Sequence, residues 1–179
     1  MLEAIRVRLA RGGTWPAFAL LFFAFILCTQ GFELRRNTLG CAERLLDTRF
    51  WYTPDKALDL LGRLGVGGRR LYAVTELSLD LVFPFIYGGL FSILIAKLYS
   101  RRRRGLLLSA VALAVTSDLC ENVLVSYLAY SYDGQPSSVA WAAAAFTALK
   151  SLTIILLCGV VLAGAIWSLL SARALNGEC

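Results

Sequence analysis

Six polar side chains stand within long apolar stretches of the sequence, where a polar group needs a partner. They are Glu76, Asp80, Asp118, Glu121, Asn122 and Lys150. Carboxylates, an amide and an amine in such surroundings suit the binding of a cation, a proton-linked solute or a polar lipid headgroup. An acidic side chain among them has the chemistry of a general acid or base, but no nucleophile or complete catalytic motif accompanies it. The sequence therefore favours a binding site over an enzyme.

Helical spacing places these residues on shared faces. Glu76 and Asp80 are four positions apart, and Glu121 follows Asp118 by three. Residues at these separations lie on one face of a helix. At a rise of about 1.5 Å per residue, Asp80, Glu121 and Lys150 fall about 14 to 16 Å from the same end of three consecutive segments. We therefore expect three helices to bring ionisable groups to one level.

The charge of this set requires compensation. Four ionised carboxylates against one Lys leave an excess of three negative charges, which desolvation and repulsion both oppose. Protonation, a bound cation or a water-filled cavity would relieve that excess. A metal here would be a hard cation, Mg²⁺, Ca²⁺ or Mn²⁺, with Asp80, Asp118 and Glu121 as candidate ligands. The alternative is that the polar residues only tie helices together, through hydrogen bonds worth about 1 kcal/mol or less each.

Residue types that are missing exclude several classes of site. The sequence contains no His, which removes Ser-His hydrolysis and the usual haem ligand. The five Cys residues form no CxxC pair, so neither a zinc site nor a thiol redox centre is expected, and no cofactor is predicted. Asp80 and Asp118 lack the Tyr-Asp and Gly-x-Gly-Asp contexts of intramembrane aspartyl proteases.

The composition places these side chains in a membrane protein. The 179 residues are 58% hydrophobic and 17% charged, with a mean hydropathy of +0.67, whereas soluble proteins carry about 25% charged residues. Helices that cross a bilayer core of about 30 Å need about 20 apolar residues. Four segments are suitable: 15–32, 71–99, 106–130 and 139–170. The sequence thus predicts an all-α integral membrane bundle of four transmembrane helices, forming one domain.

A long first loop, residues 33–70, connects the first two segments. Connections beyond about 12 to 15 residues rarely lack structure. Thr53 can cap a helix that begins at Pro54, and Leu residues at helical spacing follow until the glycines of 65–68, which should end it. The preceding aromatic residues are of types that anchor at headgroup depth: Phe50, Trp51 and Tyr52. We expect an amphipathic helix at the membrane interface or over the bundle, either as a connector or as a lid.

The basic residues bear on orientation rather than on nucleic acid. The net charge is +6, but the basic residues flank apolar segments without a stripe of base-stacking aromatic residues, so no nucleic acid is expected as a partner. The short link 101–105 contains four Arg, whereas 131–138 contains neither Lys nor Arg. By the positive-inside rule, both termini lie on the cytoplasmic or matrix side. The plasma membrane and the mitochondrial inner membrane both fit.

The basic stretch before residue 15 has three interpretations. A signal peptide is disfavoured because the small-residue pattern of a cleavage site does not follow the apolar segment. An organelle-targeting segment is a second interpretation, carried by Arg6, Arg8 and Arg11. We favour the third, in which the first apolar segment is retained as a transmembrane helix.

These features lead to one leading hypothesis and two alternatives. In the first, the six polar residues line a cavity that opens toward the amphipathic loop and binds a cation, a proton-linked solute or a polar lipid headgroup. In the second, the chain is a non-catalytic accessory or assembly subunit of a larger membrane complex, for example a respiratory one, and the cluster is structural. In the third, it is an assembly factor or scaffold that captures partners through residues 41–68.

Overall fold

The computed structural model describes residues 14–40 and 44–176, with side chains described as far as residue 171. Over these residues the chain is helical, and four helical units are long and apolar enough to cross a membrane, as predicted. The helices are α2 (Thr14–Leu39), the short 3₁₀ turn η1 (Leu46–Thr48), α3 (Pro54–Glu76), α4 (Leu79–Leu98), α5 (Arg101–Tyr130) and α6 (Val139–Asn176). The basic stretch before residue 14, together with Cys41, Cys179 and the Arg173 side chain, lies outside this description.

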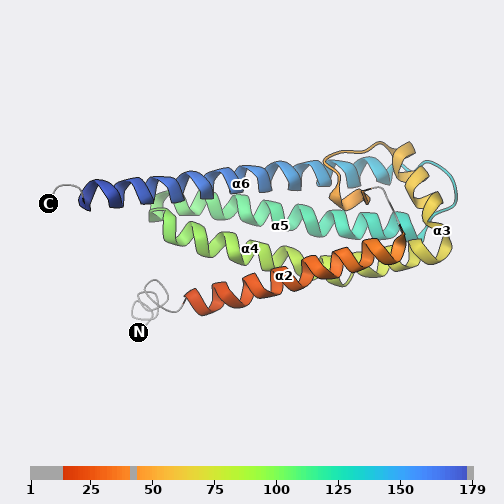
Figure 1. The fold of residues 1–179 in the computed structure, drawn as a ribbon. Helices are drawn as coiled ribbons and strands as arrows, with labels where there is room; N and C mark the ends of the chain where they lie inside the picture. Colours follow the sequence, from red (N-terminus) through yellow and green to blue (C-terminus); the bar gives the residue numbers. More distant parts are fainter. Residues whose placement is uncertain (1–13, 41–43, 177–179) are drawn as a thin grey trace, which may run out of the picture.

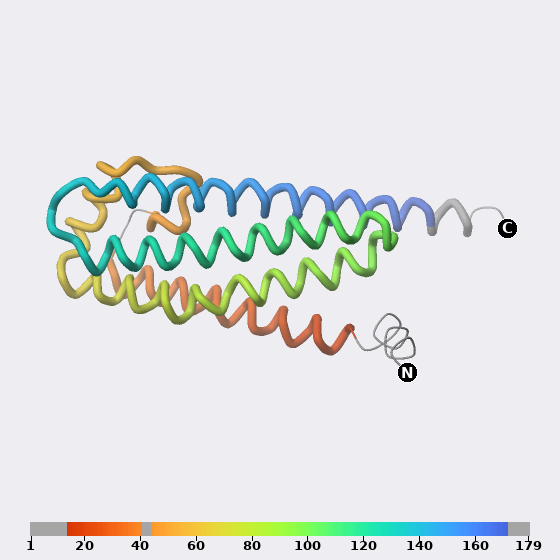
Figure 2. Tube along the Cα trace, turned by 180° about the vertical axis from the view of Figure 1, so that it is seen from behind, coloured from red at the N-terminus to blue at the C-terminus, as the bar shows by residue number. Residues whose placement is uncertain are grey.

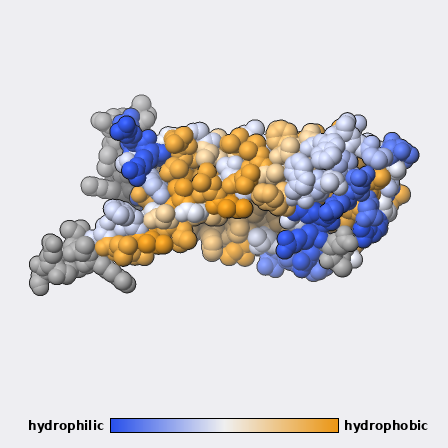
Figure 3. All heavy atoms as spheres, turned by 90° about the horizontal axis from the view of Figure 1, so that it is seen from above, coloured by the Kyte–Doolittle hydropathy of each residue, from blue (hydrophilic) through white to orange (hydrophobic). Residues whose placement is uncertain are grey.

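The four long units run side by side in an elongated bundle, with α3 and η1 gathered at one end (Figure 1). The link between α4 and α5 lies at the opposite end, as do the beginning of α2 and the end of α6, and the view from behind shows the same arrangement (Figure 2). On the face seen in Figure 3, apolar side chains cover the middle of the molecule, and hydrophilic side chains collect toward both ends. This distribution is what a bilayer with aqueous layers on either side requires.

The first helix is longer than the predicted span 15–32. α2 continues to Leu39 and packs mainly against α4, where the Phe32 ring meets the Phe83 ring edge-on at 5.1 Å between centroids. The added turns carry Arg35, which is only 4% exposed. A buried guanidinium is costly unless it is paired, so the extension depends on the partners described below.

The predicted second span, 71–99, is broken. α3 ends at Glu76 and α4 begins at Leu79, so the helix is interrupted between the two acids of this segment. The four-residue spacing predicted that Glu76 and Asp80 share one helical face. Because the helix is interrupted between them, they do not lie on one continuous face. Both side chains nevertheless reach the same partner, Arg35.

The helix of the first loop begins as predicted. The Thr53 side chain accepts a hydrogen bond from the backbone N–H three residues on, and Pro54 occupies the first turn. Gly65 interrupts α3 with a φ of 63°, a conformation open to glycine. The prediction that Gly67 and Gly68 also end the helix was wrong. They stay helical because the chain resumes a helical path directly after Gly65 and buries its second half against the bundle.

The amphipathic part of α3 covers the end of the bundle. Ala57, Leu60 and Leu61 are buried in one core with residues of η1, α5 and α6. Tyr52 joins this core at 1% exposure, so its side chain packs inside the bundle and is not available as an interfacial anchor. Trp51, 47% exposed, lies against Trp141 with ring centroids 6.0 Å apart, and it remains suited to the interface.

The link between α4 and α5 is shorter than predicted. The Arg run of 101–104 forms the first turn of α5 instead of a loop. Arg104 Nη2 donates to the carbonyl oxygens of Ala96 and Tyr99 at 2.7 and 3.2 Å. These bonds satisfy carbonyls at the end of α4 that lack intrahelical donors, and they explain how so tight a turn is held.

Candidate functional site

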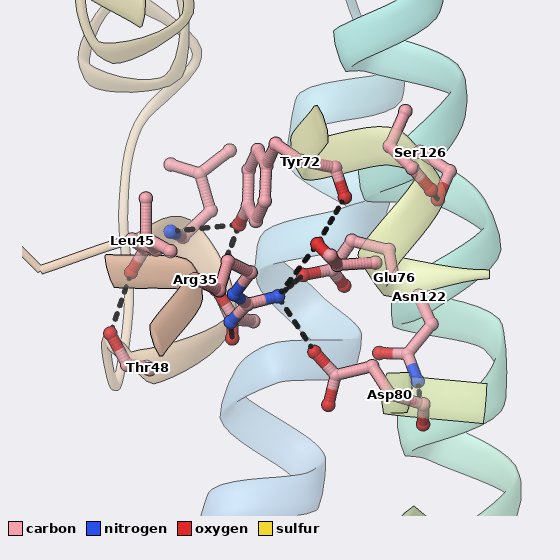
Figure 4. Close-up of polar contacts among 12 residues, drawn as sticks. Arg35, Leu45, Thr48, Tyr72, Glu76, Asp80, Asn122 and Ser126 are labelled. Carbon is pink, nitrogen blue, oxygen red and sulfur yellow. Dashed lines mark hydrogen bonds and ion pairs between the residues drawn. The ribbon is translucent and has the colours of Figure 1, made fainter. Parts of the chain in front are cut away.

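Arg35 lies at the centre of a buried acidic group (Figure 4). Its Nη1 contacts Glu76 Oε1 at 2.7 Å and Asp80 Oδ2 at 3.1 Å, and its Nη2 contacts Asp47 Oδ2 at 2.7 Å. One guanidinium thus joins α2, η1, α3 and α4. The planar fork of five N–H donors suits Arg to several acceptors at once.

Tyr72 fixes η1 over this group. Its hydroxyl donates to Asp47 Oδ1 at 2.8 Å and accepts from the backbone N–H of Leu46 at 3.1 Å. The phenol is fully buried, and its ring also lies 5.4 Å from the Arg35 guanidinium carbon. The chain between α2 and α3 is therefore part of the site and not a slack connection.

A second network joins α4, α5 and α6. Lys150 Nζ contacts Asp118 Oδ1 at 2.9 Å and also binds Glu121 Oε2. The Tyr87 hydroxyl donates to the other Asp118 oxygen at 2.9 Å, and the Thr147 hydroxyl donates to Glu121 Oε1 at 2.6 Å. Each carboxylate of this network therefore has a partner on both oxygens.

Asn122 connects the two networks through the backbone. Its Nδ2 donates to the carbonyl oxygen of Asp80 at 2.7 Å. Pro84, four residues on, has no N–H to offer that carbonyl. The amide of Asn122 replaces the missing intrahelical donor, and its own Oδ1 has no hydrogen-bond partner among the described residues.

All six residues singled out in the sequence are buried, and they lie within these two connected networks. The candidate metal ligands Asp80, Asp118 and Glu121 are divided between the networks. Among the described residues, Asp47, Glu76 and Asp80 each have one carboxylate oxygen within 4.8 Å of an oxygen of the other two. Arg35 stands among these three, in the position that a cation would take.

Sequence reasoning missed Arg35, Asp47, Tyr72 and Tyr87. Arg35 and Asp47 fall in the predicted extramembrane loop 33–70, where charged side chains are expected to be exposed. The excess of negative charge was the one signal that pointed to a missing cation. The structure adds one acid, Asp47, and one cation, Arg35, to the predicted set. Five carboxylates then face two cations, so the excess negative charge is still three.

A cavity of about 460 Å³ lies beside both networks. Its wall is formed by parts of α2, α4, α5 and α6 and by the segment 44–50. The acids that reach it are Asp47, Asp80 and Asp118, and the basic residues are Arg44, Arg49 and Lys150. The remainder of the wall is mainly aromatic and aliphatic, including Phe32, Phe83, Tyr87, Ile154 and Ile155. This volume is in the range of sites for small ligands.

One carboxylate oxygen in the cavity wall has no protein partner. Asp80 uses Oδ2 for Arg35, while its Oδ1 has no ion pair or hydrogen bond within the described part of the chain, although the residue is only 5% exposed. Figure 4 shows this second oxygen turned away from Arg35. Such a group attracts a cation or a strong hydrogen-bond donor.

Comparisons with protein-family models, with curated proteins and with solved structures find no match for this chain.

Proposed function

We propose that the chain is a multi-pass membrane protein whose cavity binds the cationic polar end of an amphiphile that enters from the bilayer. The observation that supports this most is the position of Asp80 Oδ1, an unpartnered carboxylate oxygen in the wall of a cavity whose exposed lining includes the apolar side chains of Phe50 and Ile155. Of the three ligand types expected from the sequence, a polar lipid-like end fits best. Binding is favoured over catalysis because no nucleophile accompanies the acids.

The mouth of the cavity supports entry from lipid. Ile155 of α6 and Phe50 of the segment after η1 line it, and they are 63% and 52% exposed. Within the bilayer such side chains contact acyl chains, whereas a free ion would approach through water. An apolar tail can therefore rest at the mouth while a polar end reaches Asp80.

Electrostatics support a cationic end. The two networks hold five carboxylates against Arg35 and Lys150, and the Asp118 and Glu121 oxygens are already engaged. A cation beside Asp80 Oδ1 would reduce the excess negative charge without displacing Arg35. The aromatic side chains of Phe83 and Tyr87 in the same wall suit an ammonium group as well.

Binding of radiolabelled decyltrimethylammonium to the purified protein in nanodiscs tests this proposal. Ser151 lines the cavity, whereas Leu152, its neighbour on α6, is 55% exposed on the outer face. Ser151→Trp should fill the cavity and weaken saturable binding by tenfold or more, a change of about 1.4 kcal/mol. Leu152→Trp, which adds an indole at the adjacent position outside the cavity, should leave binding unchanged.

Charge is tested separately. Asp80→Asn keeps an oxygen acceptor for Arg35 but removes the negative charge, and it should weaken binding about tenfold. Asp59→Asn, at a position 60% exposed by side chain and outside the cavity, is the matched control. Equal binding by Ser151→Trp, Asp80→Asn and the unmodified protein would remove the cavity from consideration.

The accessory-subunit and scaffold alternatives make a different prediction. They require a stable larger assembly in mild detergent, whereas a ligand-binding protein can migrate as a monomer or homodimer. The exposed apolar side chains of α6 do not discriminate, because they suit lipid and protein neighbours equally. We also propose that the Arg run and both termini lie on the cytoplasmic or matrix side, in a plasma membrane or a mitochondrial inner membrane.

A further inference from the structure

Charges of both signs line the cavity, and Asp47, Asp118 and Lys150 are engaged within the two networks. Asp80 belongs to the buried network, whereas Arg44 is exposed and Arg49 is partly exposed in the segment beside η1. Arg49 Nε donates to the Arg44 carbonyl oxygen at 2.8 Å, which keeps these two basic residues in one local turn. Asp80, with its unpartnered oxygen, is therefore the buried acceptor of the cavity, and Arg44 and Arg49 are basic residues at its more exposed side.

A ligand that satisfies both ends must carry both charges in a fixed order. Arg guanidinium groups bind phosphate through paired, charge-assisted hydrogen bonds. Ammonium groups bind carboxylates and aromatic faces, here Asp80 with Phe83 and Tyr87. An ammonium inside, a phosphate at the rim and apolar chains outside reproduce the order of groups in a zwitterionic phospholipid.

We propose that the cavity takes the phosphoammonium headgroup of a bilayer phospholipid, with the ammonium at Asp80 and the phosphate at Arg44 and Arg49. This inference rests on the proposed function, which already places a cationic end in the cavity. It adds the anionic group, the residues that bind it and the source of the ligand. The exposed Ile155 side chain at the mouth then contacts the first methylenes of an acyl chain.

The test compares ligands that share one end and differ in the other. Binding of dodecylphosphocholine and decyltrimethylammonium is measured on the purified protein in nanodiscs, each below its micellar concentration. The double variant Arg44→Gln, Arg49→Gln should weaken the binding of dodecylphosphocholine about tenfold or more. It should change the binding of decyltrimethylammonium by less than about twofold. The control is Arg63→Gln, Arg70→Gln, which removes the same charge from residues that do not line the cavity. This control should change the binding of neither ligand.

The outcomes separate this inference from the proposal beneath it. If dodecylphosphocholine binding is unchanged in the rim variant, the phosphate site is wrong, while a Ser151→Trp effect on decyltrimethylammonium still supports a cationic site. If neither ligand responds to Ser151→Trp, both proposals are wrong. Decyl phosphate that binds as tightly as dodecylphosphocholine would overturn the ammonium assignment. Free phosphocholine that binds as tightly would overturn the bilayer lipid as the source.

Discussion

Asn122 and Asp80 meet at a defect that a proline creates in α4. The Asn122 amide donates to the Asp80 carbonyl at 2.7 Å, and Pro84 is the residue whose N–H would otherwise serve that carbonyl. The buried amide thus has a structural task at the backbone, in addition to its position between the two charged networks. This separates Asn122 from the acids with which the sequence grouped it.

The relationship between Asn122 and Pro84 predicts non-additive stabilities. Asn122→Ala leaves a buried carbonyl without a donor and should lower the free energy of unfolding by about 1 to 3 kcal/mol. In a Pro84→Ala background residue 84 supplies an N–H, so the same substitution should cost less. Unfolding of the four proteins in a double-mutant cycle measures this coupling. Strictly additive effects would show that the hydrogen bond does not compensate for the proline.

Two neighbouring arginines on α2 should differ sharply. Arg35→Gln leaves three buried carboxylates without their shared cation, and it should destabilise the fold by about 3 to 5 kcal/mol. Arg36 pairs with Glu33 at the surface, where its side chain is 56% exposed, so Arg36→Gln should cost less than about 1 kcal/mol. Thermal unfolding in one detergent compares the two. Similar losses would argue against a special role for the buried pairings.

The glycines of α3 should also respond in opposite directions. Gly65 has a φ of 63° and a ψ of 179°, which a side chain strains, so Gly65→Ala should destabilise by about 1 to 3 kcal/mol. Gly67 is helical, and a Cβ there meets nothing within 4 Å, so Gly67→Ala should stabilise by about 0.5 to 1 kcal/mol. Stabilisation by both substitutions would mean that α3 is not interrupted at Gly65.

Tyr52, which lies outside the predicted spans, should make the stability of the fold depend on pH. Burial raises the pKa of its phenol above the ordinary value, which is about 10. The folded state therefore favours the neutral phenol, whereas the unfolded chain ionises from about pH 10. The stability contributed by this group is fully present below that pH and is lost as the pH rises toward the folded-state pKa.

The measurement for Tyr52 is the unfolding temperature of the unmodified protein and of Tyr52→Phe between pH 8 and 11. The unmodified protein should lose stability relative to Tyr52→Phe as the pH rises through this range. Tyr130→Phe, which removes a phenol at an 86% exposed residue, controls for the loss of a hydroxyl itself. A constant difference between Tyr52→Phe and the unmodified protein would contradict a buried, neutral Tyr52.

The sequence was sufficient for features that depend on local patterns. Hydropathy located the four spans, and the Thr53 and Pro54 pair located the start of the loop helix. Helical rise also predicted that acids of one segment would meet Lys150 of another, as the ion pair with Asp118 confirms. Each of these follows from spacing along the chain, which a sequence states directly.

What the sequence did not provide depends on pairings between distant segments. A charged residue after an apolar run usually lies in water at the end of a span. Arg35 is instead buried in an extended helix, because it has three acidic partners from other segments. The break between Glu76 and Leu79 contains no Gly or Pro from which it could be predicted. Tyr52 likewise has an interfacial residue type, and only the packing of α3 onto the bundle buries it.

The Arg35 network has a consequence for assembly in the membrane. Arg35 emerges during synthesis 41 residues before Glu76 and 45 before Asp80. Until those acids arrive, the guanidinium has no buried partners from α3 and α4, and lipid is a costly environment for it. The last turns of α2 should therefore stay at the water interface and enter their final position only when α4 is inserted. We therefore expect the first helix to dock late, together with α3 and α4.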